Sequence, residues 1–397
     1  MKVLMINSVC GIRSTGRICT DIAEELEKAG HTCKIGFGRE SVPEKYAEYA
    51  VRIGTPTGVN VHGGLSRIFD DAGFHSKAAT KKFLKWVEEY DPDVIHLHNI
   101  HGYYLHIGEL FKYLKKANKP VVWSLHDCWS FTGHCAHFDG IGCEKWKTGC
   151  YGCPQKKLYP TSLLLDNSKR NYKKKKSLFQ GLQNLTLVVP SVWLATKVAQ
   201  SYLGEYSTKI IPNGIDLSVF RPTKSNFREK YGLTDKKIVL GVATAWSKNK
   251  GIEDFIALSK TLGEEYQVVL VGVKSDLAPQ LPKEILALPR TNNVQELAEI
   301  YTAADVFFNP SIQETMGLTT VEAMACGTPA IVYDKTAVPE VVTQRSGIVL
   351  PCSIRGFKEA FERATALDKA DILAQAEKFE KGEKFGEYIR LYEGCMQ

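Results

Sequence analysis

Short apolar runs alternate with amphipathic segments along most of the chain, and this pattern predicts an α/β protein. Runs such as 2–7 and 94–97 lack the strict alternation of half-buried strands, so they are interpreted as parallel strands buried on both faces. Segments between them, such as 18–29 and 78–89, carry apolar residues at the spacing of amphipathic helices. The same succession returns after residue 237, so two α/β halves are expected.

Three segments break this pattern and are interpreted as loops or a linker. Residues 8–17, which include Gly11 and Gly16, are expected to form a loop before the first helix. Residues 56–77 are rich in Gly, His and Asp and show little periodicity, which predicts a mobile loop. The polar stretch 221–237 has the composition of a linker between the halves.

The strongest candidate chemistry lies in a strand–helix–strand unit over residues 305–334. A polar turn with Glu314 leads to a helix that begins at Gly317 and carries Glu322 about 8 Å further on, at 1.5 Å per residue. The first N–H groups of a helix attract phosphate or sugar hydroxyls, and a glycine leaves that approach open. Two such carboxylates can hold two ends of one polyol-rich ligand. The alternative is an ordinary βαβ unit with two solvated glutamates.

This unit strongly resembles the donor-site motif of family 4 retaining glycosyltransferases of GT-B fold. Glu314 and Glu322 are separated by seven residues within Glu-x-x-Gly-Leu-x-x-x-Glu-Ala-Met-Ala-Cys-Gly-Thr-Pro, and Pro339-Glu340 follows. A bare pair of glutamates at this spacing is common, but the surrounding glycine, leucine and Ala-Met-Ala-Cys-Gly-Thr-Pro tail make the match specific.

The resemblance implies two Rossmann-like domains that face each other across a cleft. An acceptor domain would cover residues 1–216 and include a Cys-rich loop at 128–157. A donor domain would cover residues 217–377, and a C-terminal helix over 378–397 would pack back on the first domain.

The resemblance also implies roles for individual residues in the donor half. Glu314 would contact the hydroxyls of the donor sugar, and Glu322 would contact the nucleotide ribose. Backbone amides near Met316, Gly317 and Leu318 would meet the diphosphate or the sugar.

Further donor contacts are expected from three cations. Lys250 and the glycine after it resemble the diphosphate-binding Lys-Gly of the family. Ala245 stands where the family commonly has an arginine, so Lys248 is a candidate for the missing positive charge. In the first half, Gly16 and Arg17 fall in the loop that faces the diphosphate in this family. Arg17 is either a phosphate ligand or the first exposed residue of the helix.

Histidines follow two predicted strands of the first half. His126 occupies the place where the family has a histidine beside the donor sugar, and a neutral imidazole can bond a hydroxyl or take the acceptor's proton. The alternative is a loop-capping histidine with Asp127 as its partner. His98, Asn99 and His101 are candidates either to face the acceptor or to stabilise their loop.

Four of the eleven cysteines are concentrated in one segment and end in a Cys-x-x-Cys pair; they are Cys135, Cys143, Cys150 and Cys153. Four thiolates can form a tetrahedral structural zinc site, with His134 and His137 as alternative ligands. Free thiols or a redox pair are the other interpretations. A catalytic metal is not expected there, because four sulfurs leave no open position.

Composition and charge indicate the expected cellular location and binding partners. The chain of 397 residues is 44% hydrophobic and 24% charged, with no apolar run long enough to span a membrane and no signal peptide, so a cytoplasmic protein is expected. The net charge of +7 is concentrated in residues 145–176, where Asp166 is the one acid. No nucleic-acid motif accompanies this cluster. It is expected to contact an anionic membrane at the inner face, or a phosphorylated acceptor, unless it is only a solvated face.

The reaction implied is transfer of a hexosyl unit, with retained configuration, from a nucleotide-diphosphate sugar to a glycan or polyprenyl-linked acceptor. The setting would be synthesis of a cell-surface polysaccharide such as capsule or exopolysaccharide, by analogy with the family. No Asp-x-Asp pair is present, in keeping with a reaction that needs no catalytic metal. The alternatives are a GT-B nucleotide-sugar epimerase or phosphorylase, and a non-catalytic scaffold built around the zinc loop.

Overall fold

The computed structural model describes residues 1–396 and divides into two compact units. The first unit comprises residues 1–212 together with the C-terminal segment from Gly382, and the second comprises residues 213–381. The predicted boundary after residue 216 therefore lies inside the second unit.

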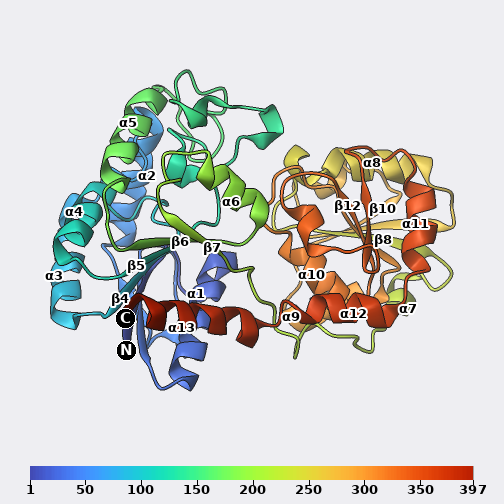
Figure 1. The fold of residues 1–397 in the computed structure, drawn as a ribbon. Coiled ribbons are helices and arrows are strands. Elements are labelled where there is room, and N and C mark those ends of the chain that lie inside the picture. The colour runs from blue at the N-terminus through green and yellow to red at the C-terminus, as the bar shows by residue number, and fades with distance from the viewer. Residues whose placement is uncertain (397) are drawn as a thin grey trace. The chain divides into compact units, whose positions relative to one another are not determined.

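The first unit is built on a parallel sheet with strand order β3-β2-β1-β4-β5-β6-β7 (Figure 1). Its strands are β1 (Lys2–Ile6), β2 (Thr32–Phe37), β3 (Ala50–Arg52), β4 (Val94–Leu97), β5 (Val121–Ser124), β6 (Leu185–Val189) and β7 (Ser207–Ile210). Its helices are α1 (Arg13–Lys28), α2 (Pro56–Phe69), α3 (Lys77–Tyr90), α4 (Ile107–Ala117), α5 (Ser168–Phe179), α6 (Val192–Ala199) and α13 (Lys381–Met396).

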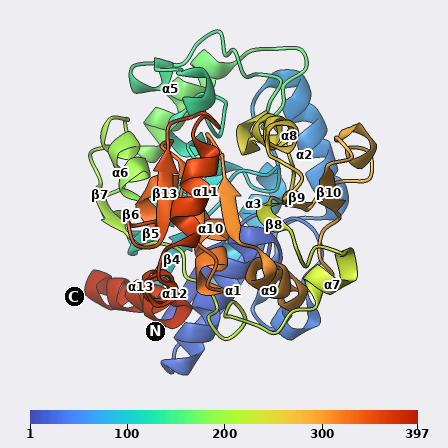
Figure 2. The same ribbon diagram turned by 90° about the vertical axis from the view of Figure 1, so that its right-hand side faces the viewer.

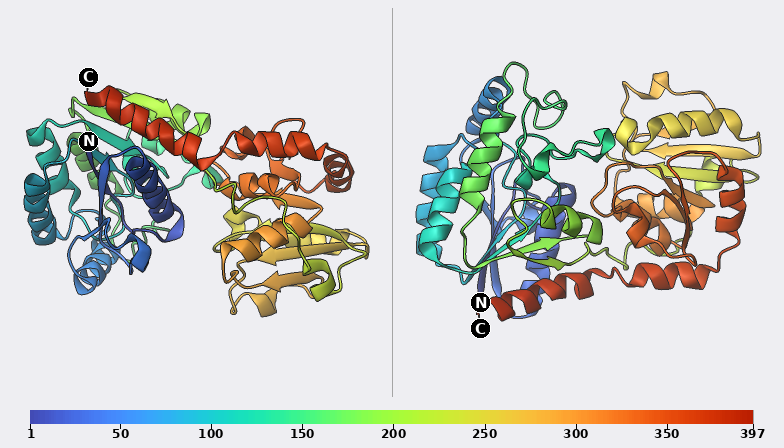
Figure 3. Two further views of the ribbon diagram at one scale, coloured as in Figure 1. Left: turned by 90° about the horizontal axis from the view of Figure 1, so that it is seen from below. Right: turned by 45° about the horizontal axis from the view of Figure 1, so that its top comes forward.

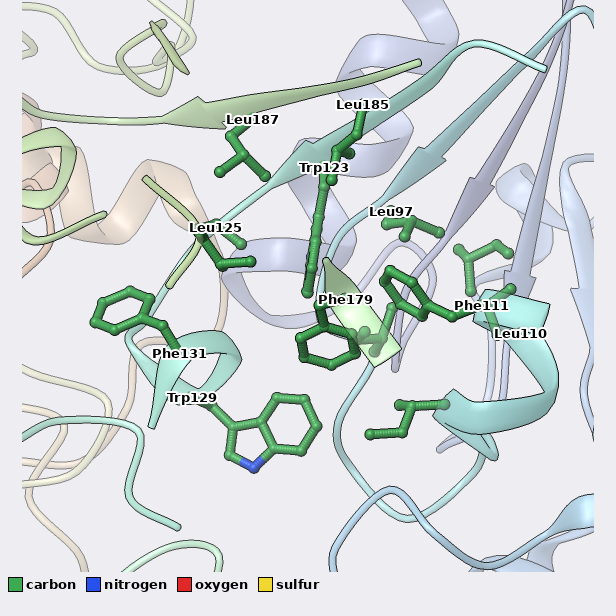
Figure 4. Packing of buried hydrophobic residues seen from close by; sticks show 14 of the residues in the cluster. Leu97, Leu110, Phe111, Trp123, Leu125, Trp129, Phe131, Phe179, Leu185 and Leu187 are labelled. Atoms are coloured by element: carbon green, nitrogen blue, oxygen red, sulfur yellow. The ribbon is translucent and has the colours of Figure 1, made fainter. Parts of the chain in front are cut away.

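Both faces of this sheet are covered, which is why its strands read as continuous apolar runs. Along β1, Val3 belongs to a core cluster with residues of α1 and α13, and the next residue, Leu4, belongs to a second cluster with residues of α3, α4 and α5. Figure 4 shows the aromatic part of the second cluster. There Phe179 packs against both Phe111 and Trp123, with ring centroids 4.5 Å and 5.0 Å away.

The C-terminal helix packs on the sheet of the first unit (Figure 3). The hydroxyl of Tyr392 lies 2.6 Å from Nδ1 of His96, and the hydroxyl of Tyr388 lies 3.0 Å from Oγ of Ser124. All four side chains are buried, so these hydrogen bonds satisfy polar groups that water does not reach.

The second unit has a parallel sheet with strand order β10-β9-β8-β11-β12-β13 (Figure 2). Its strands are β8 (Lys237–Val242), β9 (Tyr266–Val271), β10 (Ile285–Leu288), β11 (Val306–Asn309), β12 (Ala330–Tyr333) and β13 (Gly347–Leu350). Its helices are α7 (Phe227–Tyr231), α8 (Ile252–Thr261), α9 (Val294–Ala303), α10 (Leu318–Ala325), α11 (Phe357–Thr365) and α12 (Lys369–Glu377).

Two predicted irregular segments are in fact structured. Most of 56–77 is helix α2, where Pro56 is the first helical residue and the side chain of Thr55 accepts a hydrogen bond from Gly58 N at 3.1 Å. The stretch 221–237 is not a linker, because it lies within the second unit and places Phe227 in its core. The period of α2 was not visible because its buried residues are His62, Gly63 and Ser66, whereas the apolar Val61, Ile68 and Phe69 are exposed.

The loop predicted over 8–17 is also shorter than expected, because α1 begins at Arg13. The first turn of this helix is polar and has no side-chain cap at Ile12, so the apolar period becomes visible only from Ile18. Gly16 and Arg17 consequently lie on the helix and not in the loop before it.

Candidate active site

The turn between β11 and α10 is held by one asparagine at the end of the strand. The side-chain amide of Asn309 donates to Oγ1 of Thr320 at 3.0 Å, and its carbonyl oxygen accepts from Ser311 N at 3.1 Å. Gly317 ends the turn with φ of 88° and is the N-cap of α10. Only glycine adopts this left-handed conformation without strain, so the backbone of the turn requires glycine at this position of the motif.

Glu314 and Lys250 meet in this turn. The ammonium group of Lys250 donates a hydrogen bond to Oε1 of Glu314, and the two side chains remain 33% and 21% exposed. The backbone of Glu314 is fixed as well, since its N–H donates to Oγ1 of Thr336 at 3.1 Å and its carbonyl oxygen accepts from Ala337 N at 3.3 Å. Two predicted donor residues, 64 positions apart in the chain, are thus brought together and remain accessible to a ligand.

Lys250 reaches this position because two loops are fastened to each other. β8 and β11 are neighbouring parallel strands, so the loops after them share one edge of the sheet. The N–H of Ile312 donates to the carbonyl oxygen of Asn249 at 3.0 Å. Gly251 has φ of 72°, and a Cβ there would lie 2.3 Å from Cγ of Pro310. A glycine after Lys250 is therefore required for this contact.

Glu322 has a partner that sequence analysis missed. The hydroxyl of Tyr301, on α9, donates to Oε2 of Glu322 at 2.9 Å. Burial, and then the neighbouring charge of Glu322, raise the pKa of the Tyr301 phenol well above its usual value, so it remains a donor. In the sequence Tyr301 is one more large residue on the buried side of a helix, and nothing marks it as a partner of Glu322.

The remaining predicted donor residues of the second unit lie around this turn in different environments. Lys248 is largely exposed, and its ammonium is 3.7 Å from Glu253. Met316 is buried, with Sδ 3.2 Å from Asn213 N, so only its backbone is placed to meet a ligand. Leu318, the first residue of α10, is half-buried against the core.

In the first unit, two predicted histidines are adjacent at the carboxyl ends of β4 and β5. Nδ1 of His98 lies 3.0 Å from Nε2 of His126, and the rings stack at 5.3 Å. Burial lowers the pKa of His126 to about 4, against the opposing effect of Asp127. His126 is therefore neutral near pH 7, as the proposed hydroxyl contact needs.

Asp127, the partner that the alternative interpretation gives to His126, also interacts with His101. Its Oδ2 lies 2.9 Å from Nε2 of His101, whose Nδ1 lies 2.8 Å from the hydroxyl of Tyr159. Burial would raise the pKa of Asp127, but His101, His137 and the backbone N–H of Trp129 together lower that pKa to about 2. Tyr159 was not anticipated, because it comes from a distant loop without periodicity.

Helix α1 places Gly16 and Arg17 in different environments. A Cβ on Gly16 would lie 3.0 Å from Cγ2 of Val9, so this glycine allows close packing against the loop after β1. Arg17, the next residue, is exposed on the helix surface. A phosphate contact for either residue stays a prediction.

The four clustered cysteines have the donor chemistry of a zinc site. Their side chains are free thiols. Those of Cys135 and Cys153 are close neighbours, and Sγ of Cys150 accepts from Gly133 N at 3.1 Å. Within residues 1–396, however, no group of three or more His, Cys, Asp or Glu side chains is placed to hold a metal ion. The alternative ligand His134 is engaged with Asp70. The zinc site stays a prediction.

Comparisons with known proteins identify the family of the chain. The family model "Glycosyltransferase Family 4" matches residues 15–219, and "Glycosyl transferases group 1" matches residues 223–390. A curated Escherichia coli K12 protein, provisionally named as the colanic acid biosynthesis glycosyl transferase WcaC, is 28% identical over 64% of this chain and 63% of its own. The chain thus matches less than two thirds of the length of that relative.

Two solved structures extend the similarity to the whole fold. A sucrose-phosphate synthase of Thermosynechococcus elongatus superposes with a TM-score of 0.72 and 16% identity, over 99% of this chain and 98% of its own. Anabaena Alr3699/HepE, solved in complex with UDP and glucose, superposes with a TM-score of 0.69 and 16% identity, over 99% and 100%. Together with the two parallel sheets, these similarities confirm the predicted GT-B fold.

Proposed function

Because the chain belongs to glycosyltransferase family 4, we propose that it transfers a hexosyl unit from a nucleotide-diphosphate sugar to a hydroxyl group, with retained configuration. The observation that carries this proposal is the contact between Lys250 and Glu314 beside the start of α10. It supplies a cation, a carboxylate and helix N–H groups within one turn. The bound UDP and glucose of the similar HepE structure support a nucleotide-sugar donor.

Each residue of this turn has a distinct task. Lys250 and the first N–H groups of α10 would stabilise the negative charge that develops on the departing diphosphate. A diphosphate would compete with Glu314 for the ammonium of Lys250, which leaves Glu314 free to accept hydrogen bonds from sugar hydroxyls. Glu322, oriented by Tyr301, would accept from the ribose hydroxyls.

On the acceptor side, His126 would form a hydrogen bond with a hydroxyl of the reacting sugars. Nε2 of His126 is engaged by His98, so the imidazole would use its other ring nitrogen either to donate to an acceptor hydroxyl or, as the neutral base, to receive its proton. The depressed pKa of His126 favours this neutral form. Its stacked neighbour His98 fixes the ring orientation.

The acceptor would be a glycan or polyprenyl-linked intermediate of a cell-surface polysaccharide such as capsule or exopolysaccharide. The colanic acid assignment of the similar Escherichia coli protein supports this class. A lipid carrier would bring the enzyme to the cytoplasmic face of the cell membrane. No helix of residues 1–396 is long and apolar enough to span a bilayer.

The four clustered cysteines would hold one structural zinc ion. Zinc would cross-link their loop without taking part in transfer, because four thiolates leave no open position. The protein purified without chelators should contain about one zinc per chain, and joint Cys150→Ser and Cys153→Ser substitution should release it. Absence of zinc in the unsubstituted protein by elemental mass spectrometry would remove the site.

A nucleotide titration followed by a donor panel tests the function. We expect UDP or GDP to bind in calorimetry, and one nucleotide sugar to be consumed only when an acceptor is added. A scaffold would bind neither nucleotide. An epimerase would convert the donor without acceptor, and a phosphorylase would depend on inorganic phosphate. Any of these three outcomes would overturn the assignment.

A further inference from the structure

An exposed apolar patch lies in the first unit, and none of its residues belongs to the predicted donor or histidine sites. Leu163, Leu164 and Leu165 follow one another in the loop before α5 and are 63%, 65% and 47% exposed. Ile68 and Phe69, at the end of α2, are exposed as well. Single exposed apolar residues are ordinary, but five neighbouring ones mark an interaction surface. These five residues are called the leucine patch.

Backbone hydrogen bonds join the two segments of the patch. The N–H of Leu163 donates to the carbonyl oxygen of Arg67 at 2.7 Å, and the N–H of Leu165 donates to that of Ile68 at 3.3 Å. Buried Ser162 anchors the loop, with Oγ donating to the carbonyl oxygen of Leu165 at 2.7 Å. The leucines are therefore held outward by the fold and do not turn inward to the core.

Basic side chains surround this patch. Arg67 is exposed and precedes Ile68 in the chain, and Lys169 and Arg170 are exposed at the start of α5. The ammonium of Lys156 bonds the carbonyl oxygen of Leu164 at 3.1 Å. Two acids lie nearby: Asp166 accepts from Cys153 N at 2.6 Å and from Ser168, and Asp71 lies 3.8 Å from Arg170. The basic residues outnumber these two acids.

The lysine run of α5 contributes less than its sequence suggests. Lys175 is buried, with its ammonium bonded to the carbonyl oxygen of Trp129 and 3.7 Å from that ring's centroid. Lys173, Lys174 and Lys176 are exposed. The three exposed leucines belong to the loop that leads into this same helix.

We propose that the leucine patch inserts into the interface of an anionic bilayer, with the surrounding cations on lipid headgroups. Apolar side chains within a basic rim match the layering of such a membrane, acyl chains beneath anionic headgroups. A second copy fits less well, because an isologous contact would bring the same cations face to face. The proposal deepens the proposed function, and rests on it only in that a polyprenyl-linked acceptor lies in the membrane.

Vesicle flotation with four forms of the full chain tests the proposal. The wild type should bind phosphatidylglycerol vesicles more than phosphatidylcholine vesicles and keep part of its binding at high salt. Replacing Leu163, Leu164 and Leu165 with Ser should weaken binding roughly tenfold or more and remove the salt-resistant part. Replacing Lys173, Lys174 and Lys176 with Gln should remove mainly the salt-sensitive part. Val294→Ser, an exposed apolar residue of the second unit, is the matched control and should bind normally.

Three outcomes would overturn the proposal. The wild type could fail to bind anionic vesicles, or the triple serine variant, with an unchanged melting temperature, could bind as well as the wild type. The third is a dimer in sedimentation that the serine variant converts to monomer, with vesicle binding unaltered, which would assign the patch to a second copy. Nucleotide binding measured on the same preparations distinguishes a failure of the membrane proposal from a failure of the proposed function. If it persists while vesicle binding is absent, only the membrane surface is wrong.

Discussion

Glu314→Gln separates a catalytic from a structural role for the carboxylate beside Lys250. The amide keeps the size of the side chain and removes its charge. Because both members of the ion pair are partly exposed, at 21% and 33%, the pair stabilises the fold by no more than about 1 kcal/mol. A lost transition-state contact to the donor would instead cost about 2.7 kcal/mol or more in activation free energy, a rate loss on the order of a hundredfold.

The assay measures both quantities on the same preparations. Initial rates of nucleotide release in the presence of acceptor report transfer, and urea unfolding reports stability. Glu362→Gln is the matched control, because Glu362 pairs with Lys237 at 2.7 Å on the exposed surface of the same unit. It should change neither quantity. Near-wild-type turnover of Glu314→Gln would refute the assignment, and a loss of several kcal/mol of stability would make the carboxylate structural.

Three further predictions concern packing, protonation and orientation. Gly251→Ala should destabilise the second unit by about 1 kcal/mol or more beyond the loss caused by Gly232→Ala. Both glycines have positive φ, but only a Cβ at position 251 would meet Pro310. Equal losses of stability in urea unfolding would contradict this. Burial lowers the pKa of His62 to about 3, so below its usual pKa near 6.5 the unfolded chain takes up a proton that the folded chain does not. The stability that the folded protein owes to a neutral His62 is fully present above pH 6.5 and is lost as the pH falls towards 3. The substitution His62→Gln should therefore reduce the loss of unfolding free energy between pH 7 and pH 5 by about 2 kcal/mol. An unchanged loss would refute this reasoning. Tyr301→Phe removes the hydrogen bond to the predicted ribose-binding carboxylate and should weaken nucleotide binding about fivefold, roughly 1 kcal/mol, in calorimetry; unchanged affinity would make that bond irrelevant to the donor.

The pattern of apolar residues was sufficient to predict two α/β halves with parallel sheets, and the motif around Glu314 was sufficient to predict the family. Continuous apolar runs mark strands covered on both faces, and the clusters on either side of β1 bear this out. The motif around Glu314 was readable because each of its parts has a local cause, such as the left-handed turn at Gly317. Segments where the local signal is weak were misread, most clearly helix α2, whose cap and proline were present but whose apolar period was not.

What the sequence could not determine were contacts between residues far apart in the chain. Lys250 meets Glu314 only because β11 lies beside β8, although β9 and β10 come between them in the sequence. Tyr301 reaches Glu322 from another helix, and Tyr159 reaches His101 from a distant loop. Periodicity and motifs report the conformation of neighbouring residues, whereas strand order and loop packing decide which distant side chains meet. The residue types of the candidate site could therefore be predicted from the sequence, whereas the tertiary structure determined which residues they contact.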